Sequence, residues 1–255
     1  PYACTFAIFA TGRAWEQMRQ SVAYPGLDVK VVGTHGGLVG KDGASHHGIE
    51  DVSAVRKLPM VCVCPSVEEV GYVLEVTADD KSPTYIRLFR HDAEVKFDMK
   101  DFHIETGERD INGNRAKYIR PYRILEGNDV VVFSNGYMLS KAFDACKELK
   151  LRRGIDAGLV SVPYVKPFDD DPGGQLMHSL MESKSWVSVE DHRREGGLGS
   201  AIAENVVEKL PKRGKIISIP SDRVIGSGGV EELYHDCGLS VERLVESIAC
   251  FYYNR

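Results

Sequence analysis

Residues 29–50 read VKVVGTHGGLVGKDGASHHGIE, a short apolar run that leads into a loop rich in glycine, histidine and aspartate. Val29, Val31 and Val32 are typical of a buried β-strand. The glycines that follow allow positive φ and a close approach of the backbone to a ligand. The loop therefore carries proton donors and acceptors at the carboxyl end of a strand, where open α/β sheets bind ligands. Composition alone equally fits an ordinary glycine-rich connection with solvated histidines.

The segments around this loop alternate between strand and helix patterns. An aromatic, β-prone run at 2–9 is followed by helical spacing after Gly12, and the alternation continues from 49 to 90. A second alternation of apolar runs and amphipathic helices occupies 129–252. Strands that alternate with helices are typical of parallel sheets with right-handed crossovers. We therefore predict an α/β fold of two doubly wound domains with mainly parallel sheets.

A polar, turn-rich stretch separates the two alternations. Within it, Asp110, Asn112, Gly113 and Asn114 predict a β-hairpin. Domain boundaries fall in such stretches because few contacts cross them. We expect a first domain at 1–105, a linker at 106–122 and a second domain at 123–255. The chain starts with Pro1 inside a pattern, so we expect part of the first domain to precede it.

The composition is that of a soluble globular protein. Of 255 residues, 43% are hydrophobic and 27% are charged, enough to bury a core in each of two domains. The formal net charge of −5 provides no basic footprint for nucleic acid or an anionic membrane. No run approaches the roughly 20 apolar residues of a membrane span, and no signal peptide is visible. We expect a cytoplasmic protein that binds neither nucleic acid nor membrane.

The six cysteines are too scattered for a disulfide scaffold. None has the paired spacing of a metal site, so we expect no metal ligands in this chain. Cys62 and Cys64 are two residues apart in a predicted strand, where their side chains point to one face. We interpret the cysteines as core or surface residues of a reducing compartment.

A second glycine-rich turn occurs where Gly196, Gly197 and Gly199 open a helical pattern. Glycines at the start of a helix can cradle an anion. The spacing of a dinucleotide fingerprint is absent, so we predict no dinucleotide site.

Two motifs carry a resemblance to a known family. The string THGGLVGKDGASHHGIEDVSAVRKLPMVCVCPS at 34–66 resembles the thiamine-diphosphate pyrimidine-binding domain of transketolases. The string VEDHRREGGLGSAIAE at 189–204 is similar to the signature of that family's C-terminal domain. With the flanking PYACTFAIF and RLFR, the likeness covers nearly the whole chain. It is closest to the C-terminal subunit of a split transketolase.

The resemblance implies a cofactor pocket built from aromatic rings. Phe6 and Phe9 resemble the family's T-F-x-x-F aromatics, which hold the aminopyrimidine ring of thiamine diphosphate. Without the resemblance, both residues fit ordinary core aromatics. Gly12 stands where the family often has a third aromatic, so the packing around the ring differs here.

The resemblance also implies substrate-binding and catalytic residues. His35 and His46 resemble the histidines that contact substrate hydroxyls and phosphate, and histidine exchanges protons near neutrality. Asp42 resembles the aspartate that recognises the donor's hydroxyl configuration. Arg90 resembles the arginine that holds the sugar phosphate, although it also fits a surface arginine at a strand end.

Three positions depart from the family pattern. Lys41 replaces the usual glutamate, which bears on acceptor preference or subunit pairing. His47 replaces the usual glutamine, and we interpret it as a residue that supports the site residues without contacting the substrate. The stretch from His35 to Gly40 is one residue shorter than in most transketolases, and it resembles 1-deoxyxylulose-5-phosphate synthase in this respect.

The resemblance implies an enzyme that works only with a partner subunit. We find neither the family's activating glutamate nor its diphosphate motif, so an α-like subunit would hold the diphosphate and its Mg²⁺ or Ca²⁺ in an α2β2 heterotetramer. The implied reaction is transfer of a two-carbon ketol unit from a ketose, expected to be phosphorylated, to an aldehyde or carrier acceptor. The alternatives are a 1-deoxyxylulose-5-phosphate synthase-like or 2-oxo acid dehydrogenase β-like subunit, and a non-catalytic partner subunit.

Overall fold

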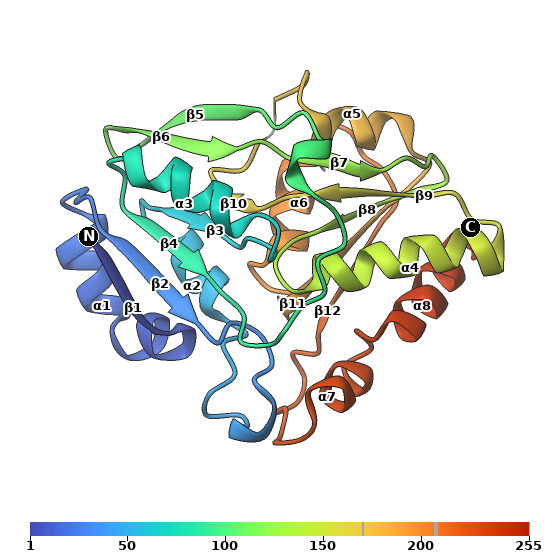
Figure 1. Ribbon diagram of the computed structural model, residues 1–255, viewed down its shortest axis with the longest axis horizontal. Helices are drawn as coiled ribbons and strands as arrows, with labels where there is room; N and C mark the ends of the chain where they lie inside the picture. Colours follow the sequence, from blue (N-terminus) through green and yellow to red (C-terminus); the bar gives the residue numbers. More distant parts are fainter. Residues whose placement is uncertain (170, 207–208, 255) are drawn as a thin grey trace.

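Two five-stranded sheets organise the chain, and in each sheet one edge strand is antiparallel while the other pairings are parallel (Figure 1). The computed structural model describes residues 1–169, 171–206 and 209–254. The predicted α/β class with mainly parallel sheets is confirmed. Within the described residues, no helix combines the length and the apolar character needed to cross a membrane.

The first sheet carries the loop, rich in glycine and histidine, that follows Thr34. Its strands, in spatial order, are β1 (Tyr2–Phe6), β2 (Lys30–Thr34), β4 (Thr84–Arg87), β3 (Val61–Val63) and β10 (Tyr164–Lys166). The helical segments that accompany it are the π-turns η1 (Phe9–Arg13) and η2 (Arg19–Ala23), with α1 (Trp15–Met18), α2 (Asp51–Arg56) and α3 (Val70–Asp79). The loop itself includes the short 3₁₀ turn η3 (Gly40–Asp42).

The second sheet belongs to the C-terminal half of the chain. Its strands, in spatial order, are β12 (Gly214–Ile219), β11 (Trp186–Arg193), β8 (Val130–Ser134), β9 (Ala157–Ser161) and β7 (Tyr122–Leu125). Its helices are α4 (Met138–Arg153), α5 (Gln175–Glu182), α6 (Leu198–Val206), α7 (Val230–Asp236) and α8 (Val241–Tyr253). The helix α4 ends at Gly154, whose φ of 65° is the left-handed conformation that glycine adopts without strain.

A hairpin connects the two halves. The strands β5 (Thr106–Ile111) and β6 (Asn114–Ile119) pair antiparallel, after the short turn η4 (Met99–Asp101). Asn112 and Gly113 have φ of 55° and 80°, as a tight two-residue hairpin turn requires. The predicted hairpin is therefore confirmed, while the domain boundary at 106–122 remains a prediction.

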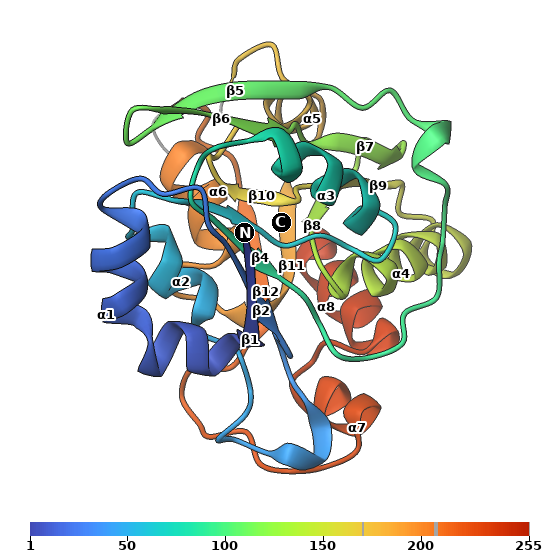
Figure 2. The ribbon, with the colours of Figure 1, turned by 60° about the vertical axis from the view of Figure 1, so that its left-hand side comes forward.

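The buried hydrophobic clusters are shared between the two halves. One buried cluster joins Met18 and Val52 from the first half with Phe133 and Trp186 from the second. In addition, β10 comes from the C-terminal half and pairs with β3 in the first sheet. As a result, the loop after β2 lies beside the chain that leads into α7, at the same end of the molecule (Figure 2).

Candidate functional site

Four aromatic side chains gather at the carboxyl ends of β1 and β2. Phe6 and Phe9 lie with nearly parallel rings, 4° apart in orientation and 5.6 Å between centroids. The His35 ring stacks on Phe6 with a centroid distance of 3.8 Å. His46 presents its edge to both phenylalanines, at 5.9 Å from Phe6 and 5.4 Å from Phe9. The structure thus brings together four residues that are up to 40 positions apart in the sequence.

The parallel register explains this gathering. Phe6 is the last residue of β1 and pairs with Thr34, the last residue of β2, so His35 follows directly at the same edge. Phe9 opens the π-turn η1 three residues after Phe6. His35 has a φ of 60°, a strained value for a residue other than glycine that often marks a functional position.

All four rings are partly exposed, so they do not form a closed core. A flat, partly polar heterocycle gains about 0.5–1.5 kcal/mol from aromatic contacts beyond the area that it buries. The cluster therefore combines aromatic rings with two imidazoles that can exchange protons.

Asp42 and Arg90 form an ion pair beside this cluster. The side chains are 37% and 45% exposed, respectively, so a ligand from solvent can reach both. Burial lowers the pKa of His35, the positive charge of Arg90 lowers it further, and Asp42 acts in the opposite direction. These couplings mean that the ion pair lies within electrostatic reach of His35, and all six predicted site residues belong to one region.

Residues 35–48, which we call the histidine loop, are closed at their base by glycine. Gly37 and Gly48 exchange backbone hydrogen bonds of 2.7 and 3.1 Å. Gly37 has a φ of 85°, and a Cβ atom there would lie 2.0 Å from a carboxylate oxygen of Asp191. Only glycine satisfies both constraints, so the base of the loop is fixed directly against the C-terminal half.

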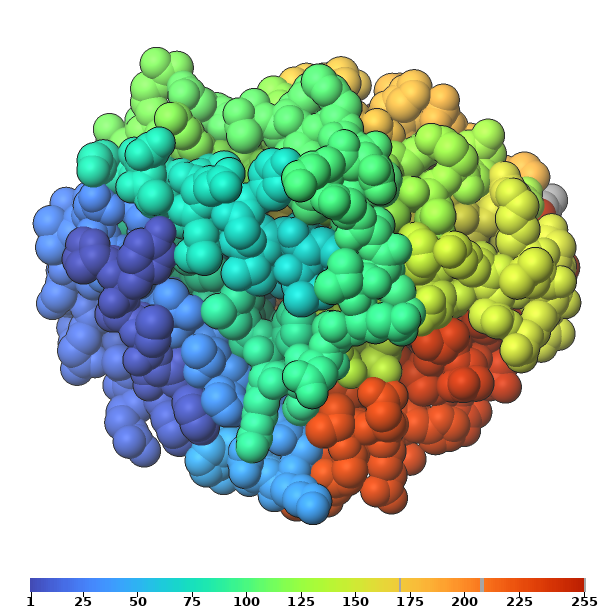
Figure 3. Space-filling view, in the orientation of Figure 1, coloured from blue at the N-terminus to red at the C-terminus, as the bar shows by residue number. Residues whose placement is uncertain are grey.

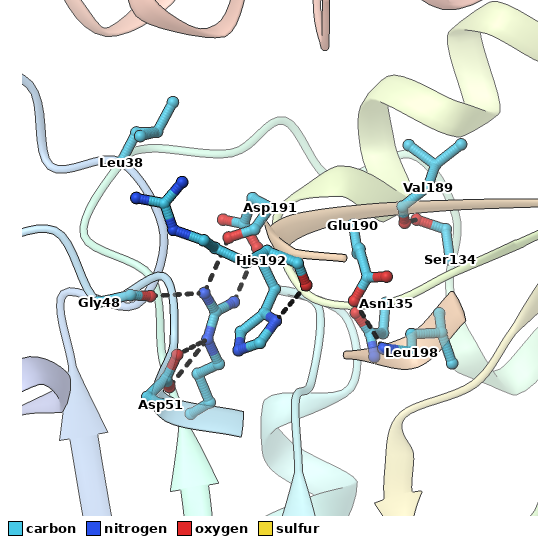
Figure 4. A network of polar contacts seen from close by, with 12 residues as sticks. Leu38, Gly48, Asp51, Ser134, Asn135, Val189, Glu190, Asp191, His192 and Leu198 are labelled. Atoms are coloured by element: carbon cyan, nitrogen blue, oxygen red, sulfur yellow. Dashed lines mark hydrogen bonds and ion pairs between the residues drawn. The ribbon is translucent and has the colours of Figure 1, made fainter. Parts of the chain in front are cut away.

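A buried arginine joins this base to both halves of the chain. Arg87 in β4 donates to Asp51 at 3.0 Å, to Asp191 at 2.7 Å and to the carbonyl of Gly48 at 2.9 Å. Tyr234 donates a further hydrogen bond of 3.0 Å to Asp191. Figure 4 shows Asp51, Gly48 and Asp191 converging on this point. We call Arg87 with Asp51 and Asp191 the arginine clamp.

Sequence reasoning did not single out Arg87. The available signal was a charged residue inside an otherwise apolar strand pattern, since lone buried charges are rare without partners. Its partners Asp51 and Asp191 are distant in sequence and could not be named from spacing.

The glycine turn at 196–199 holds a carboxyl group that belongs to the chain itself. The Glu190 carboxylate accepts hydrogen bonds from the backbone N–H groups of Leu198 (2.6 Å) and Gly199 (2.9 Å) at the start of α6. A Cβ atom on Gly197 would lie 2.1 Å from this carboxylate. Burial raises the pKa of Glu190 to about 8. The turn therefore binds a buried side chain of the protein itself and not an external anion.

Comparison with known proteins identifies relatives for both halves. Residues 1–95 match the family described as transketolase, pyrimidine binding domain, and residues 122–244 match transketolase, C-terminal domain. A protein of Methanocaldococcus jannaschii named as a transketolase C-terminal section is 35% identical over 97% of this chain and 73% of that protein. The 6-deoxy-6-sulfo-D-fructose transketolase subunit SqwH of a Clostridium species is 33% identical over 94% of this chain and 67% of that protein.

A solved structure is similar over nearly the whole chain. A split gene transketolase, described as an inactive beta4 tetramer, has a TM-score of 0.82 and 31% identity, covering 99% of this chain and 75% of that chain. The matched ranges include the six site residues and the arginine clamp.

Proposed function

The chain belongs to the transketolase family as a C-terminal subunit, and we propose that it transfers a two-carbon ketol unit from a phosphorylated ketose to an aldehyde or carrier-bound acceptor. The observation that carries this proposal is the cluster of Phe6, Phe9, His35 and His46. It combines aromatic faces for a heterocycle with two imidazoles that exchange protons.

We propose that Phe6 and Phe9 hold the pyrimidine end of thiamine diphosphate. The nearly parallel rings are partly exposed, which suits contact with a flat heterocycle. When bound, this cofactor supplies the carbanion and electron-sink chemistry of the reaction. The protein's part is to bind, orient and exchange protons.

His35 and His46 are the proposed proton carriers at the substrate hydroxyls. Because burial and Arg90 lower the pKa of His35, this imidazole is neutral at neutral pH and can accept a proton. His46 forms T-shaped contacts with both phenylalanine rings, so it lies beside the rings that would hold the cofactor. General acid–base groups in such positions contribute about 10²–10⁴-fold to a rate.

Asp42 and Arg90 are proposed to recognise the sugar. Asp42 would orient a donor hydroxyl, while Arg90 would hold the distal phosphate. A guanidinium group carries five N–H donors, so Arg90 can bind Asp42 and an anion together. The relative named for 6-deoxy-6-sulfo-D-fructose also has a name that refers to a ketose with an anionic end, which supports an anion contact here.

We further propose a cytoplasmic α2β2 assembly in which an α-like subunit holds the diphosphate and its Mg²⁺ or Ca²⁺. The similar split gene transketolase is described as inactive when it forms a beta4 tetramer, as expected if a β-like chain alone lacks part of the active site. The cluster on this chain would then lie at the junction with the partner.

The test is co-purification with the neighbouring subunit, followed by assays with thiamine diphosphate and Mg²⁺. A panel of phosphorylated ketose donors and aldehyde acceptors should give two-carbon transfer, detected as a shortened donor and a lengthened acceptor. Omitting either subunit should abolish the transfer. A complex that binds the cofactor yet cleaves no ketose would contradict the proposal.

The second candidate is a 1-deoxyxylulose-5-phosphate synthase-like reaction, favoured by the short stretch from His35 to Gly40. In that case the complex would release CO₂ from a 2-oxo acid and would leave ketose donors intact. Adding radiolabelled 2-oxo acids to the same panel separates the two reactions.

A further inference from the structure

His46 and His47 are consecutive residues with opposite surroundings. His46 is partly exposed and contacts the phenylalanine rings. His47 is only 2% exposed and its ring is hydrogen-bonded to Val39 and Gly226. Because the two residues are adjacent in the chain, the position of the His47 ring constrains the position of the His46 ring.

The hydrogen bonds of His47 define its tautomer. The backbone N–H of Val39 points at Nδ1 over 3.0 Å, and a backbone amide can only donate. Nδ1 is therefore the acceptor, so Nε2 carries the proton and donates it to the carbonyl of Gly226 over 3.0 Å. Burial lowers the pKa of His47, which favours this neutral form.

Through these two bonds, one imidazole performs two functions. The bond to Val39 joins the two limbs of the histidine loop across eight residues. The bond to Gly226 joins the loop to the chain before α7, 179 residues further along. Since a buried polar group without a partner costs about 1–3 kcal/mol, both bonds resist opening.

The chain before α7 forms the support on which the loop rests. Ser227 donates a hydrogen bond of 2.6 Å to the carbonyl of Lys41. A Cβ atom on Gly40 would lie 3.0 Å from Val230, which shows how closely the two segments pack. In Figure 3, residues near 40–48 adjoin the residues that precede and begin α7 at the lower edge of the molecule.

We propose that His47 is a positioning residue that fixes His46 against Phe6 and Phe9. The neutral His47 ring holds the loop to Gly226, and this contact sets where the adjacent His46 ring lies. The C-terminal half of the chain thereby determines the geometry of a site whose side chains all come from the first half. The effect on turnover rests on the proposed function, whereas the effect on the loop does not.

The first experiment compares substitutions at His47 in the complex with the partner subunit. His47→Gln keeps one acceptor and one donor, so kcat should stay within about 3-fold of the unchanged enzyme. His47→Leu keeps neither, and kcat should fall about 100-fold, the scale on which a displacement of about 1 Å acts. KM and the affinity for thiamine diphosphate should change far less than kcat in both variants.

His192 offers a matched control for this experiment. It is also 2% exposed, and its ring also accepts a backbone N–H, from Ser53 at 3.4 Å. It has no hydrogen bond to the histidine loop among those described. His192→Leu should lower the unfolding midpoint as His47→Leu does, yet leave kcat within about 3-fold.

The second experiment needs no turnover. Nitrogen chemical shifts of the His47 ring in the intact chain should report a neutral imidazole protonated at Nε2. Hydrogen exchange at the Val39 amide should be faster in His47→Leu by at least 10-fold, and unchanged in His47→Gln and His192→Leu.

The outcomes are distinguishable. The positioning role is wrong if kcat falls equally in His47→Gln and His47→Leu, or equally in His47→Leu and His192→Leu. It is also wrong if hydrogen exchange at the Val39 amide is unchanged in His47→Leu. If the unchanged complex shows no ketol transfer, the proposed function is wrong, and the exchange and nitrogen measurements still decide the role of His47.

Discussion

Phe9 and His46 contact each other edge to face over 5.4 Å, yet we assign them different functions. Phe9→Ala removes an aromatic face and should weaken thiamine diphosphate binding to the complex by about 5- to 10-fold, corresponding to 1 kcal/mol or slightly more. His46→Ala removes a proton carrier and should lower kcat by about 100-fold while the cofactor affinity changes little. Calorimetry and steady-state kinetics separate the two.

A control for these substitutions is Phe97→Ala, since Phe97 is also partly buried and packs against other aromatic rings away from the site. It should alter stability without altering cofactor affinity. Equal loss of cofactor affinity in Phe9→Ala and His46→Ala would contradict the assigned roles.

Removing either charge of the ion pair beside His35 should shift the pKa of His35, and the two shifts should have opposite directions. Arg90→Gln removes a positive charge and should raise the pKa of His35, whereas Asp42→Asn removes a negative charge and should lower it. Because neutral His35 is the proton acceptor, the acid limb of turnover should move to higher pH in the first variant and to lower pH in the second. Ring-proton titration by NMR measures the pKa directly.

Shifts of the His35 pKa in the same direction in both variants would show that the ion pair does not act through its charge.

The sequence motifs pointed to six side chains that the structure brings together. Phe6, Phe9, His35, Asp42, His46 and Arg90 lie in one region because parallel strands place their following residues at one edge. The carboxylate partners of Arg87 could not be foreseen, because their contacts depend on how β4, α2 and β11 meet in space.

At the scale of elements, the arginine clamp connects β4 with α2 and β11. Arg87→Met would leave Asp51 and Asp191 buried beside each other without a cation, and breaking a buried ion pair in this way costs about 3–5 kcal/mol. Urea unfolding should show a loss of that size. Adding Asp191→Asn should recover part of it, since one of the two buried charges is then removed.

Arg56 supplies the matched control, because it also bridges the two halves but pairs with Glu204, whose side chain is 59% exposed. Arg56→Met should cost no more than about 1 kcal/mol. If the two methionine variants are equally stable, the clamp contributes no more than a surface pair.

Strand and helix patterns predicted most elements, and the misses have physical reasons. The spacing of Ser66 and Glu69 predicts a helix start at Ser66, and Glu69 does accept the Ser66 N–H at 2.7 Å. The helix α3 nevertheless begins only at Val70, and the Glu69 carboxylate also accepts hydrogen bonds from Tyr122 and Ser161. Elements such as α5, α7 and β12 were not foreseen, since glycine, proline and charge interrupt their short patterns.

Across the whole molecule, the four rings of the site remain partly exposed, as we expect if a partner subunit covers them. The isolated chain should therefore bind thiamine diphosphate with a Kd weaker than about 1 mM even with Mg²⁺, because aromatic contacts alone supply little of the binding free energy. Calorimetry on the chain with and without the partner subunit tests this expectation. Tight, metal-dependent binding by the chain alone would show that the diphosphate site lies within it.

The sequence predicted two alternations of strand and helix, but periodicity could not show that the two halves pack against each other. A core cluster that mixes residues from both halves depends on which apolar faces meet, and periodicity gives only that each face is apolar. Periodicity also does not decide which of the two sheets the short strand Tyr164–Lys166 joins.

Strand β10 has a consequence for how such a gene can be rearranged. Because Tyr164–Lys166 follows the hairpin along the chain yet pairs with β3, a break in the reading frame between these two strands would strip an edge from the first sheet. A recombination that exchanged only the leading third of the gene would create the same defect. A division of the chain between β3 and β10 would therefore require a new edge strand for the first sheet.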